Sequence, residues 1–199
     1  MRKTLVSALV LASNVLVAAT PIDGFYSSAF GGYSMTPTFI NHAQTFNQGG
    51  YDAGLNFGYK SYPMRYEGEV SYYDSGVNAY SINHRKQTGV RGYDQAVLGL
   101  ANVYYDLPEL IATLQPFIGA GVGFAWAQQN VSSSGPIQVN ELNNTKSTFA
   151  YQATGGISYH FAENYSLYLA YRFIGTSSVT SFNQANAGVT YRFDGNSYK

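Results

Sequence analysis

The chain has 199 residues, a length typical of one domain, and its equal numbers of acidic and basic residues give a formal net charge of zero. It has no basic stripe to support a nucleic-acid partner, and the lack of cysteine excludes disulfides and thiolate metal sites. Only 11% of the residues are charged and 16% are aromatic, whereas about 25% of the residues of a soluble domain are charged.

The N-terminus has the pattern of a secretory signal peptide. Arg2 and Lys3 precede an apolar stretch that ends at Val17, and two small residues follow it. This stretch is shorter than the roughly 20 residues of a membrane-spanning helix, so we favour a cleaved signal over an anchoring helix. We therefore predict that residues 1–19 are a signal peptide and that residues 20–199 form the mature domain.

The mature domain contains eight segments in which apolar residues alternate with polar or small ones. This alternation is typical of transmembrane barrel strands, whose apolar residues face lipid and whose other residues face the lumen. No run of about 20 apolar residues offers a spanning helix instead. The predicted strands are Gly24–Ser34, Tyr51–Lys60, Met64–Asp74, Tyr93–Leu107, Gln115–Ala127, Thr148–Phe161, Tyr165–Ile174 and Ser181–Phe193. We predict an all-β fold, an eight-stranded antiparallel transmembrane up-and-down β-barrel.

The charged residues of these segments lie on the face opposite the apolar residues. In Met64–Asp74, for example, Val70 shares a face with tyrosines, while a basic and two acidic residues lie on the other face. An eight-stranded barrel is just wide enough inside for side chains, so we interpret such charges as a paired, lumen-filling network rather than a gated ion path. The predicted network is Arg65, Glu67, Glu69, Asp106, Arg172 and Arg192.

The connections between the segments alternate in length. Met35–Gly49, Ser75–Arg91 and Gln128–Ser147 are long and polar, whereas Ser61–Pro63 and Ala162–Asn164 are tight turns. Outer-membrane barrels have long extracellular loops and short periplasmic turns, so the long connections are predicted to lie at the cell surface. Aromatic residues near the short turns are predicted to form the periplasmic girdle: Tyr59, Tyr105, Phe161 and Phe193.

Four motifs resemble one family. Arg65–Tyr72, Ala101–Asp106 and Pro116–Gly123 resemble the third, fourth and fifth strands of the opacity and surface-antigen outer-membrane proteins, whose barrel is OmpA-like. The motif Gly188–Phe193 resembles the signal that the outer-membrane assembly machinery reads, with Gly188, Tyr191 and Phe193 as its characteristic residues. The family signal usually ends the chain on its aromatic residue, whereas residues 194–199 follow it here.

The resemblance implies a protein of the bacterial outer membrane that displays loops at the cell surface. Its implied partners are outer-membrane lipid, the assembly machinery and host or surface ligands bound through the loops. The implied role is structural, adhesive or antigenic. A narrow porin-like channel is the main alternative, followed by a lipid-modifying barrel enzyme and a secreted lipocalin-type binding barrel.

Catalytic chemistry has little support in the sequence. His42, His84 and His160 lack the spacing of a zinc motif, and no nucleophile elbow of the form G-x-S-x-G is present. His160 is interpreted as a structural histidine of the lumen or rim. We therefore predict a protein that is not an enzyme, with no catalytic, cofactor-binding or metal-binding residues and no cofactor.

Overall fold

The computed structural model describes residues 23–35, 38–40, 43–45, 47–77, 80–82, 85–87, 90–111, 113–133, 144–177 and 181–193. The predicted signal peptide lies outside these residues, as does the segment 194–199. Within the described part of the chain, no helix is long and apolar enough to cross a membrane.

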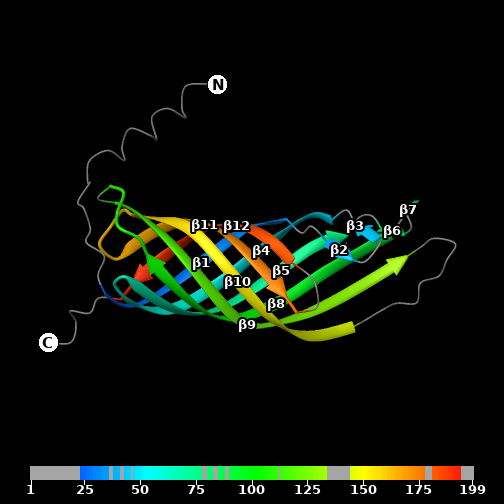
Figure 1. Ribbon diagram of the computed structural model, residues 1–199, viewed down its shortest axis with the longest axis horizontal. Coiled ribbons are helices and arrows are strands. Elements are labelled where there is room, and N and C mark those ends of the chain that lie inside the picture. Colours follow the sequence, from blue (N-terminus) through cyan, green and yellow to red (C-terminus); the bar gives the residue numbers. More distant parts are fainter. Residues whose placement is uncertain are drawn as a thin grey trace, which may run out of the picture.

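Eight antiparallel strands close into a barrel (Figure 1). In chain order they are β1 (Gly24–Met35), β4 (Asn47–Ser61), β5 (Met64–Val77), β8 (Val90–Asp106), β9 (Leu114–Ser133), β10 (Asn144–His160), β11 (Tyr165–Thr176) and β12 (Ser181–Arg192). Each strand pairs with the barrel strands before and after it, and β1 pairs with β12 to complete the ring. The predicted eight-stranded up-and-down barrel is confirmed.

The two ends of the barrel differ. At one end lie Tyr62 and Pro63, the connecting residues 107–111 and 161–164, and the pair formed by Tyr26 of β1 and Arg192 of β12. We call this the turn end, and the opposite end the loop end. The loop end carries two small hairpins, β2 (Thr38–Ile40) with β3 (Ala43–Thr45) and β6 (Tyr80–Ile82) with β7 (Arg85–Gln87), which lie at the right of Figure 1.

The strands extend further toward the loop end than the sequence predicts. β8 begins at Val90 and pairs with β9 out to Ser133, and β10 begins at Asn144. The prediction that Ser75–Arg91 and Gln128–Ser147 are loops throughout is therefore wrong. Beyond the apolar zone both faces of a strand carry polar residues, so backbone pairing continues there without the alternation by which a strand is recognised.

The barrel is apolar outside and largely polar inside. Among the described residues, 23 buried side chains are polar or charged and 13 are hydrophobic, whereas large hydrophobic side chains are exposed on every barrel strand. Leu169, for example, is 68% exposed and Arg172 only 4%. This distribution is opposite to that of a soluble domain and matches a barrel surrounded by lipid.

Aromatic rings form a continuous row on the outside of the turn end. Their centroids are 5.0–6.4 Å apart from one ring to the next across β4, β1, β12, β11 and β10. The row consists of Tyr59, Phe25, Phe57, Phe193, Tyr191, Tyr165, Phe161 and Tyr159. It includes three of the four residues predicted for the girdle, and the fourth, Tyr105, is also exposed. Amphipathic rings at this level are suited to a membrane interface.

Candidate functional site

The lumen contains three layers of side chains. A cluster of charged residues fills the turn end, an ion pair lies at the centre, and an apolar layer closes the loop end. We call these the turn-end cluster, the central pair and the apolar layer.

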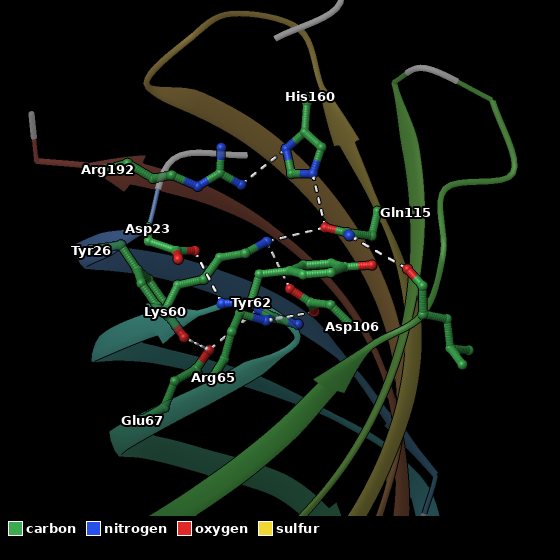
Figure 2. Close-up of polar contacts among 11 residues, drawn as sticks. Asp23, Tyr26, Lys60, Tyr62, Arg65, Glu67, Asp106, Gln115, His160 and Arg192 are labelled. Atoms are coloured by element: carbon green, nitrogen blue, oxygen red, sulfur yellow. Dashed lines mark hydrogen bonds and ion pairs between the residues drawn. The ribbon is translucent and has the colours of Figure 1, made fainter. Parts of the chain in front are cut away.

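Asp106 is the centre of the turn-end cluster. Its carboxylate lies 2.7 Å from Lys60 Nζ and 2.8 Å from Arg65 Nε, and all three side chains point inward from neighbouring strands (Figure 2). Arg65 also reaches Glu67 Oε1 at 3.5 Å, and the Tyr26 hydroxyl donates a 2.5 Å hydrogen bond to the same oxygen. The cluster thus joins β1, β4, β5 and β8 across the end of the lumen.

Two aromatic rings hold the Arg65 guanidinium. Its carbon lies 4.9 Å from the ring centroid of Tyr104 and 4.7 Å from that of Phe117, close enough for cation–π attraction. The Tyr104 ring lies over Gly119, where an added Cβ would come within 2.2 Å of it. A glycine at this inward position therefore makes room for the ring that orients Arg65.

A chain of hydrogen bonds connects Arg192 to Lys60. Arg192 Nη2 lies 3.0 Å from His160 Nδ1, His160 Nε2 lies 3.4 Å from Gln115 Oε1, and Lys60 Nζ donates to the same Gln115 oxygen at 3.1 Å (Figure 2). A guanidinium only donates, so Nδ1 accepts and the ring hydrogen lies on Nε2. This pattern indicates that His160 is neutral and that it links Arg192 to Lys60 through Gln115.

The central pair links Arg172 on β11 to Glu69 on β5. Arg172 Nη2 lies 2.5 Å from Glu69 Oε1, and both side chains are buried. A closed ring of hydrogen bonds surrounds the pair: Arg172 donates to Gln152, Gln152 donates to Asn102, and Asn102 donates to Glu69. The Phe30 ring, with its centroid 5.0 Å away, covers the guanidinium. This arrangement connects strands on opposite sides of the barrel.

The apolar layer closes the lumen on the loop side of the central pair. The rings of Tyr73 on β5 and Phe182 on β12 stack across the barrel with centroids 5.1 Å apart. The other buried members are Ala96, Leu98, Leu100, Ala125, Ala150 and Ile174. The prediction of a lumen filled with polar side chains is therefore wrong for this layer and only partly correct for the rest, where a second buried cluster contains Tyr104, Phe117 and Ala170.

Two small spaces lie in the lumen. A cavity of about 20 Å³ lies between the central pair and the turn-end cluster, and another of about 10 Å³ lies within that cluster. A space of about 10–15 Å³ holds a single water molecule. Each of these two spaces is therefore on the order of one water molecule in size.

The sequence matches the family described as outer membrane protein beta-barrel domain over residues 4–193. The chain belongs to this family. Its location is the bacterial outer membrane, as the resemblance predicts, and its apolar belt is the surface that contacts lipid.

Solved barrels of other bacteria share the fold of this outer-membrane protein. Neisserial surface protein A is 17% identical with a TM-score of 0.56, over 85% of this chain and 97% of that one. OprG of Pseudomonas aeruginosa is 10% identical with a TM-score of 0.53, over 87% and 98%. Ail of Yersinia pestis, solved with the heparin analogue sucrose octasulfate, is 12% identical with a TM-score of 0.51, over 85% and 99%.

A curated relative is also similar in sequence. An uncharacterised protein of Brucella abortus strain 2308 is 24% identical over 175 residues, which is 74% of this chain and 56% of the relative. The outer-membrane barrel thus spans little more than half the length of the curated relatives that it matches.

The structure places all six residues of the predicted ion network inside this outer-membrane barrel. Arg65, Glu67 and Asp106 meet in the turn-end cluster, and Glu69 and Arg172 form the central pair. Arg192 differs, because among the described residues its guanidinium contacts a histidine and no carboxylate lies within 4.0 Å. That the network stabilises the barrel remains a proposal, which the substitutions in the Discussion test.

Several members of the networks are absent from the predicted set, among them Lys60 and Gln152. Lys60 lies on the polar face of its predicted strand, and this position alone identifies it as an inward charge. Gln152 bridges the central pair, but a neutral amide on a strand face carries no comparable signal. Sequence alone identifies the inward face and leaves the pairing partners undetermined.

The residues of the predicted assembly signal lie on both faces of the last strand. Tyr191 and the following Phe193 belong to the exterior aromatic row, with their centroids 5.3 Å apart. Gly188 faces inward, where an added Cβ would come within 2.4 Å of the Tyr168 ring. The glycine therefore has a packing role in the folded barrel, and recognition by the assembly machinery remains a proposal.

Proposed function

We propose that this barrel anchors surface loops in the outer membrane, in a structural, adhesive or antigenic role, and that it neither conducts solutes nor catalyses a reaction. The stratified lumen supports this most strongly, because ion pairs and the apolar layer occupy the volume that a pore needs. An apolar constriction excludes water and therefore ions. The strand extensions and hairpins at the loop end supply the displayed surface.

The turn end faces the periplasm in this proposal. Its short connections and the exposed aromatic row support that orientation, since outer-membrane barrels have short turns on the periplasmic side. Trypsin treatment of intact cells tests it. We expect cleavage after Arg85 or Lys86 in β7, or after Arg91 or Lys146 in the first residues of β8 and β10 at the loop end. A periplasmic protein that stays intact is the control, and cleavage that requires permeabilised cells would reverse the orientation.

Recording in planar bilayers tests the closed lumen. We expect the wild-type barrel to give no stable single-channel steps, and Phe182→Ala with Tyr73→Ala to give small ones because the stacked rings of the apolar layer are lost. Steps of equal size in both proteins would contradict the sealed-lumen proposal and favour the porin-like alternative.

The loop end is the proposed ligand-binding surface. The basic residues at this end are Arg85 and Lys86 in the β6–β7 hairpin, Arg91 in β8 and Lys146 in β10. Ail, which shares the fold, was solved with a heparin analogue, so sucrose octasulfate is a reasonable first probe. We expect salt-sensitive binding that weakens when Arg85 and Lys86 are both replaced by alanine. Binding unaffected by the double substitution would place the ligand elsewhere.

A further inference from the structure

The turn-end cluster contains more positive than negative charge around one small cavity. The cavity has a volume of about 10 Å³, and Lys60, Arg65 and Arg192 contribute three cationic groups to its lining. Asp106 is the single carboxylate among the described lining residues. The rest of the lining is neutral: Tyr26, Gln115, Ser158, His160, Ser166 and Thr190.

The excess charge resides on Arg192. Asp106 is already engaged by Lys60 and Arg65, at 2.7 and 2.8 Å. Arg192 is 7% exposed, and its Nη2 contacts His160, which the hydrogen-bond pattern makes neutral. Its Nη1 is buried and has no hydrogen-bond partner among the described residues. A buried cation that is neither paired nor fully hydrogen-bonded is strongly unfavourable, so this site requires a counter-charge.

The size of the cavity limits which ions can supply the counter-charge. A volume of about 10 Å³ is at the lower limit for one water molecule, which excludes phosphate, sulfate and organic acids. A monatomic halide is larger than water, so it fits only with a small outward shift of the lining side chains. The nearby hydroxyls of Ser158, Ser166 and Thr190 are donors suited to a spherical anion. We propose that the turn-end cavity binds one monatomic anion of the halide class, chloride in the cell, held by Arg192 and Lys60. The anion completes the charge balance of the turn-end cluster.

Unfolding in different sodium salts tests the site. The purified full chain in detergent micelles is heated in sodium chloride, sodium bromide or sodium gluconate at one ionic strength, so that general screening is constant. We expect a higher Tm in the two halides. Each tenfold rise in halide above its dissociation constant should raise Tm by about 3–6 °C. Equal Tm values in chloride and gluconate would overturn the proposal, and this is the result expected if water or a carboxylate of the chain balances Arg192.

Two variants separate the site from general stability. Arg192→Met should abolish the difference between halide and gluconate. Asp52→Asn removes a buried lumen carboxylate that does not line the cavity, so this variant should keep the difference even if its Tm falls. A halide effect that persists in Arg192→Met would overturn the proposal.

Two measurements on the wild-type protein do not require the variant to fold. Bromide soaked into crystals should give an anomalous peak beside Arg192 Nη1, and chloride-35 nuclear magnetic resonance should show line broadening that added bromide reverses. A bromide map without a peak at the cavity would count against the site.

Discussion

The Arg172→Met substitution tests the ion pair at the centre of the lumen. It leaves Glu69, which is 3% exposed, without its 2.5 Å partner, although Ser71 and Asn102 still donate to that carboxylate. Removing one partner of a buried pair costs about 3–5 kcal/mol. Each kcal/mol lowers Tm by roughly 2–4 °C in a domain of about this size. We therefore expect a fall in Tm of about 6–20 °C.

Heat-modifiability on gels measures this effect, because the folded barrel migrates differently from the unfolded chain. Samples are heated through a range of temperatures in detergent before electrophoresis, and the folded fraction gives Tm. The double variant Arg172→Met with Glu69→Gln is the matched control, since it removes both charges, and we expect it to recover part of the loss. A single variant that unfolds within about 2 °C of wild type would refute the reasoning that this pair stabilises the barrel.

Three further substitutions test other layers of the barrel by the same gel assay. Leu169→Arg, on the lipid face, should cost about 2–4 kcal/mol if that position lies near the bilayer midplane, and unchanged Tm would argue that the face is not in lipid. Gly188→Ala should cost about 1–3 kcal/mol because a Cβ there meets the Tyr168 ring, whereas Gly155→Ala, with nothing within 4 Å, should be neutral. Glu67→Ala should cost about 1–3 kcal/mol, less than Arg172→Met, since its ion pair spans 3.5 Å; a larger loss would reverse this ranking.

The number of strands, and which face of each strand points outward, were predictable because lipid imposes one rule on the exterior. Every second residue must be apolar through the membrane, so β11 shows Leu167, Leu169 and Phe173 on one face in the sequence itself. In β8 both faces are largely apolar, so the alternation alone leaves the register open, and the structure settles it by exposing Val97 and Val103. Beyond the membrane the rule ends, and the strand extensions could not be predicted.

The contacts inside the barrel were less predictable, because the same inward side chains can pair in several ways. The sequence identifies Arg192 as an inward charge, but its contact with His160, two strands away on β10, depends on how the strands are staggered. The apolar layer was not predicted, because polar residues were expected at every inward position. Leu98 and Ile174 are apolar residues that point inward. Such residues have no periodic signature of their own, and only the closed barrel brings them together.

The pairing of β1 with β12 constrains how the chain enters the membrane. These strands share ten register pairs, from Tyr26 with Arg192 to Met35 with Asn183, and they are the first and last of the described strands. β4 covers one edge of β1, but until the final strand has been translated the backbone groups on the other edge have no partner, and hydrocarbon offers them none. Insertion of hairpins one at a time during synthesis would therefore leave an open edge in lipid. The topology requires a completed polypeptide before the ring is sealed.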